Sequence, residues 1–421
     1  MYSLAIYLYM FAANVAALFG NKKARLMVRG HRHTWRILRD KIKPVDRPIW
    51  FHAASLGEFE QGRVLMERLK REQPEYKILL TFFSPSGYEV RKDYEYADAV
   101  CYLPFDTFLN ARKFLRLAHP EKAIFIKYEF WANYMERCRR QAVPLYSVSS
   151  IFRPGQVFFR WYGGDYRRVL RCVTHFYVQN EESRRLLASR RINNVTITGD
   201  TRLDRVVQIK EAARPLPLVA AFAEGADKVF VAGSSWPPDE DIYLPYFAST
   251  PGWKLIIATH EVSTERTERL RQRFESLGLH TVAYSELKAE GSASLAGNDE
   301  AGERPSVLII DCFGLLSSIY RYATVAYVGG GFGAGIHNVP EAAVYGLPVL
   351  FGPNNQKFQE AQALLKCGGA FQVESPEDFT AMVQRFADEP ATLAAAGRAS
   401  ETYISSSSGA SERIYAAIFG A

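Results

Sequence analysis

A glutamate in the segment HAASLGEFEQG, residues 52–62, has the surroundings that a general base requires. An apolar run ends just before it, and we expect Gly57 to allow a tight turn that puts Glu58 at the start of a helix. A helix N-terminus alone would lower the pKa of this carboxylate, whereas an apolar pocket would raise it. Glu58 is therefore a candidate general base, and an ordinary glutamate of a helix start is the alternative.

Two further segments in the N-terminal half of the chain have charged residues at the ends of predicted strands. In KYEFW, residues 127–131, Lys127 and Glu129 share one face if the strand continues. An acid beside aromatic rings suits a sugar, and an ion pair at the sheet edge is the alternative. In TGDTRLDR, residues 198–205, Arg202 could neutralise a leaving phosphate, or the alternating charges could form ion pairs between domains.

The richest chemical signal is a glycine-rich segment, residues 328–361, with the sequence VGGGFGAGIHNVPEAAVYGLPVLFGPNNQKFQEA. A strand runs into the glycines at 329–331, and a helix is expected to begin near Asn338. Glycines let backbone N–H groups approach a phosphate, and a helix N-terminus adds positive potential. Glu341 shares a helix face with Asn338 and could accept from ribose hydroxyls, while a capping box formed by the two is the alternative and is compatible with that role.

Three more loops should border the same site, because each ends a strand of the second half. They are AGSSW (232–236), ATHEV (258–262) and DCFGLLS (311–317). His260 ends a strand that points at the site, which favours a phosphate contact over a core position. A separate segment, 153–171, mixes arginines with aromatic rings and would suit lipid headgroups or an anionic acceptor, with a solvated helix as the alternative.

Alternating apolar runs and helical stretches must position these groups. A strand followed by a helix, repeated, predicts a parallel sheet with helices on both faces. A proline-bearing break at 212–218 separates two such series, so we predict an α/β protein with two Rossmann-like, doubly wound domains that face a cleft. The stretch 286–304 is predicted as a surface loop. The predicted strands lie within 48–55, 76–83, 99–105, 123–130, 144–150, 175–180, 195–200, 228–235, 254–260, 305–311, 324–331 and 347–353.

The N-terminus is predicted to meet a membrane. Residues 2–20 carry no charge, and as a helix they would extend roughly 28 Å, close to the hydrocarbon thickness of a bilayer. Basic residues follow this run, which is typical of the cytoplasmic side and argues against a cleaved signal peptide. A single spanning anchor, a helix in the plane of the interface and a buried core helix are the three interpretations.

Charge and composition exclude several classes of protein. The chain has 421 residues, of which 48% are hydrophobic, as in a folded globular protein. The first 50 residues hold ten Lys and Arg against two acids, whereas the remainder is nearly neutral. A local basic block favours an anionic surface and disfavours nucleic acid as a partner. The five cysteines are scattered, which gives no support to a zinc ribbon or a cysteine-held cluster.

The ordered set of these motifs closely resembles the 3-deoxy-D-manno-octulosonic acid (Kdo) transferases of Gram-negative bacteria. The resemblance covers most of the chain and rests on ASLGEFEQ, SPSGYE (84–89), KYEFW, GDTRLD, AGSSW, the glycine-rich segment with its HNxxE, and FGPNNQKFQEA. It implies a GT-B glycosyltransferase fold, with no required metal and no cofactor. The implied domains are an anchor helix at 1–21, an acceptor domain at 22–212, a donor domain at 213–400 and, at 401–421, a C-terminal helix that packs back on the acceptor domain.

The reaction that the resemblance implies is transfer of Kdo from CMP-Kdo to the lipid A precursor, lipid IVA. It would take place in lipopolysaccharide synthesis, at the cytoplasmic face of the inner membrane and in contact with its lipids. The implied mechanism is an inverting displacement in which Glu58 takes the proton of a primary hydroxyl. A GT-B transferase that uses a UDP-sugar, and a membrane-tethered binding protein without turnover, are the alternatives.

The resemblance also implies roles for individual residues. Glu58 matches the family's catalytic base, and Glu129 and Arg202 match groups that stabilise the transition state. The acceptor-side candidates are Ser55, Gly57, Ser86 and Lys127. The positions that match donor contacts are Ser234, Ser235, Ala258, Thr259, His260, Phe313, Gly314, Leu315, Gly330, Gly331, Gly335, Asn338 and Glu341. Many members have an arginine where this chain has Thr259 and a glutamate where it has Leu315, so side-chain contacts to CMP are reduced there.

Overall fold

The computed structural model describes residues 2–291 and 305–420, and the chain divides into two compact units. The first unit comprises Met1–Arg205 with Ser408–Ala421, and the second comprises Val206–Ser407. The division falls within helix α9 (Thr201–Ala212), and not at the proline-bearing break that the sequence predicted at 212–218. Each unit has its own sheet and its own core.

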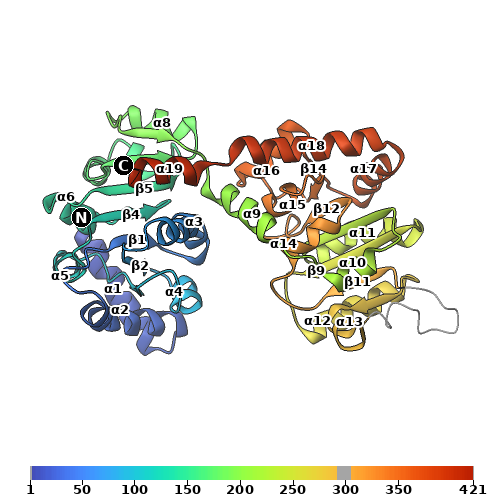
Figure 1. The fold of residues 1–421 in the computed structure, drawn as a ribbon, viewed down its shortest axis with the longest axis horizontal. Helices are drawn as coiled ribbons and strands as arrows, with labels where there is room; N and C mark the ends of the chain where they lie inside the picture. The colour runs from blue at the N-terminus through green and yellow to red at the C-terminus, as the bar shows by residue number, and fades with distance from the viewer. Residues whose placement is uncertain (1, 292–304, 421) are drawn as a thin grey trace. The chain divides into compact units, whose positions relative to one another are not determined.

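A seven-stranded parallel sheet forms the centre of the first unit, in the order β3-β2-β1-β4-β5-β6-β7. Figure 1 labels its strands β2, β1, β4 and β5. Successive strands are added on one side of β1 up to β3 and on the other side from β4 onward. The carboxyl ends of β1 and β4 therefore form the topological switch point, where open α/β sheets bind their ligands. The strands are β1 (Ile49–Ala53), β2 (Ile78–Phe82), β3 (Ala99–Tyr102), β4 (Lys122–Ile126), β5 (Leu145–Ser150), β6 (His175–Val178) and β7 (Val195–Ile197).

Helices cover both faces of this sheet, and the strands between them are buried. Neighbouring residues of β1 point to opposite faces, so Trp50 packs with Phe114 in one core cluster and Phe51 packs near Phe59 in the other. The helices between the strands are α3 (Leu56–Glu72), α4 (Pro85–Arg91), α5 (Phe108–Ala118), α6 (Ala132–Arg140), the short η1 (Val157–Phe159), α7 (Gly164–Leu170) and α8 (Glu181–Ala188).

The C-terminal helix α19 (Ala410–Phe419) belongs to the first unit, although α18 (Pro390–Ser407) belongs to the second (Figure 1). Its apolar face, which includes Ile414 and Ile418, joins the core cluster around α3. The Asp204 carboxylate accepts hydrogen bonds from the first N–H groups of α19, including that of Ser411 at 2.6 Å. A carboxylate at this position fixes the start of the helix.

The N-terminal helices α1 (Tyr2–Leu18) and α2 (Lys22–Lys41) pack against each other with a bend of 117° between them. Tyr2 ties α1 to the unit, because its hydroxyl donates a 2.5 Å hydrogen bond to Asp106. Of the residues of α1 only Ala13 is buried, so α1 is not the core helix of the third interpretation. Neither helix alone, nor any other in the described residues, is long and apolar enough to span a membrane, although α1 and α2 meet that criterion when taken together.

The second unit repeats the architecture, with a parallel sheet in the order β10-β11-β9-β8-β12-β13-β14. Its switch point lies between β8 and β12, and its core is rich in aromatic rings that pack tilted or edge-on, such as Phe230, Tyr243 and Phe379. The strands are β8 (Lys228–Ser235), β9 (Trp253–Thr259), β10 (Thr281–Ala283), β11 (Val307–Ile310), β12 (Val325–Val328), β13 (Val349–Phe351) and β14 (Ala370–Gln372). The helices before α18 are α10 (Pro217–Ala223), α11 (Pro237–Ser249), α12 (Thr264–Glu275), α13 (Tyr284–Glu290), α14 (Leu316–Ile319), η3 (Tyr320–Tyr322), α15 (Pro340–Ala343), α16 (Gln359–Cys367) and α17 (Pro376–Asp388).

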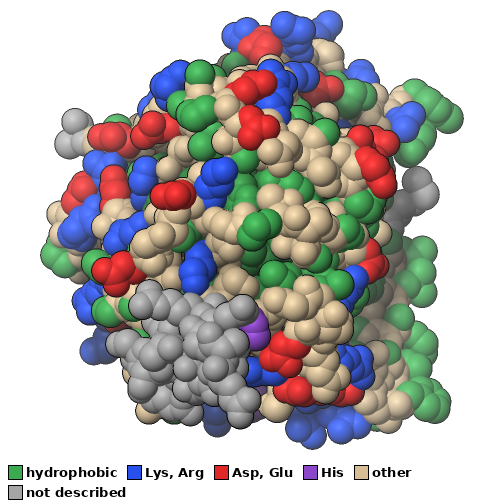
Figure 2. Space-filling model, turned by 90° about the vertical axis from the view of Figure 1, so that its right-hand side faces the viewer, with side chains coloured by type: hydrophobic (Ala, Val, Ile, Leu, Met, Phe, Trp, Pro, Cys, Tyr) green, Lys and Arg blue, Asp and Glu red, His purple; other side chains and the backbone are tan. Residues whose placement is uncertain are grey.

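The predicted α/β class with two Rossmann-like sheets is confirmed, and every strand predicted from the sequence is present. The short strands β10 and β14 were not predicted, and both lie at sheet edges. The loop predicted at 286–304 is wrong for 286–290, which lie in α13, and its larger part lies outside the described residues. Basic and acidic side chains are interspersed on the face that Figure 2 shows, around a centre of hydrophobic and uncharged groups.

Candidate active site

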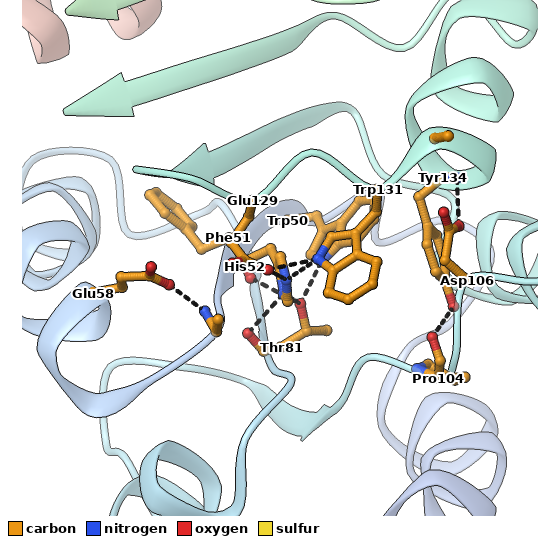
Figure 3. Close-up of polar contacts among 12 residues, drawn as sticks. Trp50, Phe51, His52, Glu58, Thr81, Pro104, Asp106, Glu129, Trp131 and Tyr134 are labelled. Atoms are coloured by element: carbon orange, nitrogen blue, oxygen red, sulfur yellow. Dashed lines mark hydrogen bonds and ion pairs between the residues drawn. The ribbon is translucent and has the colours of Figure 1, made fainter. Parts of the chain in front are cut away.

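Glu58 lies in the first turn of α3, at the carboxyl end of β1. Its side chain reaches back toward the strand, and Oε2 accepts a 2.6 Å hydrogen bond from the N–H of Ala54 (Figure 3). Burial and, after it, the negative charge of Glu129 raise the pKa of Glu58 to about 7, against the opposing effect of the Ala54 bond. A carboxylate with this pKa is half ionised at neutral pH, so it can both accept and release a proton there.

The turn that places Glu58 does not depend on glycine. The residue before α3 is Ser55, whose extended backbone directs the chain from β1 into the helix. Gly57 lies inside the first helical turn, and a Cβ added to it would meet no atom within 4 Å. The expected tight turn at Gly57 is therefore wrong, because the conformational change takes place at Ser55.

Glu129 follows the neighbouring strand β4, across the switch point from Glu58. The strand does not continue through KYEFW as expected, because it ends at Ile126 and Lys127 adopts a positive φ of 64°. A left-handed backbone at a residue that is not glycine is a strained conformation, of the kind found at functional sites. It turns the chain so that the Glu129 carboxylate accepts a 2.6 Å hydrogen bond from the indole N–H of Trp131 (Figure 3).

His52, a fully buried residue of β1, contacts this carboxylate and was not predicted. Its Nδ1 lies 3.1 Å from the carbonyl oxygen of Thr81 and 2.9 Å from the Thr81 hydroxyl oxygen. Its Nε2 lies 3.2 Å from Glu129 Oε2 and 3.1 Å from the indole N–H of Trp131. His52 thus links Thr81 of β2 to the Glu129 carboxylate beside Glu58.

Arg202 lies in the first turn of α9 and forms a two-pronged ion pair with Asp200. The nitrogen–oxygen distances are 3.0 and 2.8 Å, and Gln61 donates a further 2.8 Å hydrogen bond to the same carboxylate. The guanidinium holds the pKa of Asp200 below its ordinary value despite the burial of that group. The pair lies within the first unit, so it is not the interdomain ion pair considered as an alternative.

The remaining acceptor-side candidates lie near the same edge of the first sheet. Ser86 is in the first turn of α4, after β2, and its hydroxyl lies 2.9 Å from that of Ser84. The ammonium of Lys127 lies 5.2 Å from the ring centre of Tyr128, and its charge lowers the pKa of Glu58 in part. The first unit thus brings Glu58, Glu129 and Lys127 together at the switch point.

In the second unit, a buried carboxylate fixes the glycine-rich loop that follows β12. Asp239 Oδ2 accepts a 2.9 Å hydrogen bond from the N–H of Gly330, and Oδ1 accepts a 3.0 Å hydrogen bond from the hydroxyl of Tyr327. A Cβ on Gly331 would lie 2.5 Å from the backbone nitrogen of Gly352, so only glycine fits there. The N–H of Gly335 donates to the carbonyl of Gly330. The N–H groups of Gly330 and Gly335 are therefore used within the unit.

The pair Asn338 and Glu341 is formed, but not as a capping box. The Asn338 amide donates a 2.7 Å hydrogen bond to Glu341 Oε1, and Ser317 donates a 3.1 Å bond to Oε2. The N-cap of α15 is Val339, and this helix is only four residues long. It is too short to supply the positive end of a helix dipole that the sequence suggested. Burial raises the pKa of Glu341.

Three aromatic rings cluster at the carboxyl ends of β8 and β9. The ring centre of His260 lies 4.4 Å from that of Trp236 and 4.4 Å from that of His337, and the indole N–H of Trp236 donates a 3.2 Å hydrogen bond to Nε2 of His337. His260 is thus not a residue of the apolar core. The loop before Trp236 contains Ser234, whose φ is 52°, and Ser235, whose buried hydroxyl lies 2.9 Å from that of Tyr243.

The two positions at which the chain departs from the family differ in their surroundings. Ala258 and Thr259 are buried, and the Thr259 hydroxyl donates to the carbonyl of Glu261 at 2.8 Å. In the loop before α14, Phe313 is 78% exposed and Gly314 has a φ of 90°. Leu315 is the N-cap of α14 and offers no side-chain hydrogen bond.

The comparisons with known proteins agree with this arrangement. The family model for 3-deoxy-D-manno-octulosonic-acid transferase (kdotransferase) matches residues 24–205. A curated 3-deoxy-D-manno-octulosonic acid transferase of Bordetella pertussis is 28% identical over 397 residues, which cover 88% of this chain and 86% of the relative. The family model thus matches the first unit of this chain, and the curated Kdo transferases match most of its length. A Kdo transferase of Aquifex aeolicus is 24% identical over 344 residues, which cover 80% of this chain and 85% of that protein.

Solved structures show the fold of this chain. UDP-GlcNAc 2-epimerase of Neisseria meningitidis, bound to UDP-GlcNAc, matches 87% of this chain and 98% of its own chain with a TM-score of 0.59. At 13% identity this likeness shows the fold alone. Together with the two Rossmann-like units it gives the GT-B fold. Among residues 2–291 and 305–420, no group of three or more His, Cys, Asp or Glu side chains could hold a metal ion.

Proposed function

We propose that this chain transfers Kdo from CMP-Kdo to a hydroxyl group of the lipid A precursor, lipid IVA, in lipopolysaccharide synthesis. The observation that carries the proposal is Glu58, a carboxylate with a pKa of about 7 at the switch point of the first sheet. In a chain that is similar to Kdo transferases, a base with this pKa suits the removal of a proton from a sugar hydroxyl at neutral pH.

The proposed step is an inverting displacement. Glu58 takes the proton of a primary hydroxyl on the acceptor, and the oxygen forms a bond to the anomeric carbon of Kdo. The bond from that carbon to the phosphate oxygen of CMP breaks, and its electron pair leaves with CMP. Glu129 lies beside Glu58, and its negative charge stabilises the positive charge that develops on the sugar. Arg202, oriented by Asp200, stabilises the departing phosphate.

The proposed donor site is the switch point of the second sheet. The N–H groups of Gly330 and Gly335 bond within the unit, so other backbone groups of the glycine-rich loop and those of residues 313–315 would meet the phosphate. Asn338 and Glu341 would meet the ribose. The cluster of Trp236, His260 and His337 offers an aromatic surface of the kind on which a nucleobase packs. We propose that the reaction needs neither a metal ion nor another cofactor, since protein groups at these positions provide the charge stabilisation.

The proposed location is the cytoplasmic leaflet of the inner membrane. The helix α1 is free of charge and exposes Leu4, Leu8, Phe11 and Leu18, and α2 carries eight Lys and Arg against one Asp. An apolar surface beside basic residues suits an interface with anionic lipids. We propose that these two helices hold the chain at the bilayer, where the acceptor lipid is found.

Product analysis tests the proposed function. The full chain is incubated with CMP-Kdo and lipid IVA, with and without EDTA, and the lipids are analysed by mass spectrometry. We expect an acceptor enlarged by Kdo in both conditions, and release of CMP in proportion to it. A product formed from a UDP-sugar alone would identify a different transferase, and binding of both compounds without CMP release would identify a binding protein.

A further inference from the structure

A cavity of about 210 Å³ lies in the first unit between α1, α2 and the segment that joins β3 to α5. Its apolar wall includes Met10, Val28 and Trp35, and its polar groups include His31 and Arg32. None of its lining residues is an acid. The cavity is smaller than the sites of drug-sized ligands, which start at roughly 300 Å³, so it suits a small headgroup or the end of a chain.

His31 is the buried polar side chain of this cavity that lacks a hydrogen-bond partner in the described part of the chain. It is only 6% exposed, and neither of its ring nitrogens has a hydrogen-bond partner among the described residues. The ring packs edge-on against Phe105, with ring centres 4.4 Å apart. Burial lowers the pKa of His31 to about 3, so its imidazole is neutral and offers one donor and one acceptor. A buried polar group without a partner is unfavourable, and a ligand that bonds to it would remove this penalty.

The charges around the cavity indicate an anionic ligand. Arg32 is exposed. Among the described residues, neither Arg32 nor any other Lys or Arg of α2 forms an ion pair with an acid. The other wall comes from α1, which has no charge and exposes large apolar side chains. An anion with an apolar extension matches both walls, and a bilayer supplies such a molecule in anionic phospholipids.

The cavity is separate from the carboxylates of the candidate active site. None of Glu58, Glu129 and His52 lines it. The ring of Phe83 lies 6.1 Å from that of His31 and 4.6 Å from that of Trp131, the residue that donates to Glu129. Aromatic rings thus stand between the cavity and Glu129, which argues against a ligand whose hydroxyl reacts there.

We propose that this cavity binds one anionic phospholipid of the bilayer, with its phosphate against Arg32 and His31 and its first methylene groups against Met10, Val28 and Trp35. The proposal rests on the proposed membrane location but not on Kdo transfer. The bound lipid would hold α1 and α2 together at the interface and would support the rings that lead to Trp131. This site would exist in addition to any diffuse attraction between α2 and the bilayer.

Quenching of Trp35 fluorescence by a brominated lipid tests the proposal on the full chain. The probe is phosphatidylcholine vesicles that contain brominated phosphatidylglycerol, at about 0.5 M salt so that surface attraction is screened. The Trp35→Phe variant identifies the part of the signal that comes from Trp35. We expect saturable quenching that weakens about tenfold in Arg32→Gln and in His31→Phe and is unchanged in Arg36→Gln, the matched loss of charge on an exposed position of α2 outside the cavity.

Three results would overturn the proposal. Equal losses in Arg32→Gln and Arg36→Gln would show diffuse electrostatic attraction only. Displacement of the brominated lipid by inorganic phosphate, or by lipid IVA at concentrations near its KM, would assign the cavity to a free anion or to the acceptor. His31→Phe should keep or raise the melting temperature, because it removes two unpartnered nitrogens, whereas a lower melting temperature would show that His31 is bonded within the fold.

Discussion

The pKa of Glu58 predicts how transfer depends on pH. At a pKa of about 7, half of the Glu58 side chains are ionised at pH 7, about a tenth at pH 6 and about a hundredth at pH 5. Because only the ionised form accepts the proton of the acceptor, kcat/KM should fall about tenfold for each pH unit below 7 and level off above about pH 8. Activity is thus lost as the pH falls through the pKa of this group.

Glu129→Gln separates Glu58 from the titrating groups of the substrates. The charge of Glu129 is the second cause of the raised pKa, so its removal should move the acid limb of the kcat/KM profile to lower pH. Glutamine keeps an oxygen that can accept from Trp131, which preserves the local geometry. The acid limb of the kcat/KM profile should move to lower pH even if Glu129→Gln also lowers the kcat/KM value that is reached at high pH.

The assay measures CMP release at limiting acceptor between pH 5 and pH 9 and at constant ionic strength. Wild type should show one acid limb near pH 7, Glu129→Gln the same limb at lower pH, and Glu58→Gln a residual rate without this limb. A wild-type profile that is flat between pH 6 and pH 8, or an unshifted limb in Glu129→Gln, would refute the role given to Glu58.

Three further predictions concern stability and positioning. The pKa of Glu58 is raised from 4.5 to about 7 in the folded state, so its contribution to stability is present below pH 4.5 and is lost as the pH rises through 7. Glu58→Gln should therefore raise the free energy of unfolding of the first unit by about 3 kcal/mol at pH 8 and by almost nothing at pH 4. Urea unfolding, followed separately for each unit, measures both values. Asp239→Ala leaves the Gly330 N–H and the Tyr327 hydroxyl without their buried acceptor, which should cost about 3 kcal/mol in the unfolding of the second unit and weaken CMP binding in calorimetry. His52→Phe removes a contact to the Glu129 carboxylate, so it should lower kcat while CMP binding stays at its wild-type value, and an unchanged kcat would limit His52 to a packing role.

The long apolar runs made the sheets predictable. Strands such as β1 and β8 are buried on both faces and read as continuous hydrophobic segments that end in small or polar residues. The missed strands β10 and β14 have three residues each and lie at sheet edges, where a short segment carries no periodic signal. The division of the units inside α9 was likewise hidden, because the helix runs through it without a break in its pattern.

The candidate site was predictable only in part. Glu58 and Glu129 stand out as acids directly after apolar strands, and the switch point explains why that position matters. His52 was missed because a histidine inside an apolar strand reads as a core residue, and only the fold brings it to Glu129. The same holds for Asp239, which reads as an ordinary acid in the first turn of a helix until the loop after β12 is placed against it.

If Glu58 is the general base, transfer needs its carboxylate and CMP binding does not. The decisive measurement compares Glu58→Gln with Glu72→Gln, an exposed carboxylate at the other end of the same helix α3. Each variant is assayed for Kdo transfer from CMP-Kdo to lipid IVA and for CMP binding by calorimetry. We expect Glu58→Gln to lose about 10²- to 10⁴-fold in kcat with wild-type CMP binding, and Glu72→Gln to match wild type in both. Transfer by Glu58→Gln at a wild-type rate would contradict the account.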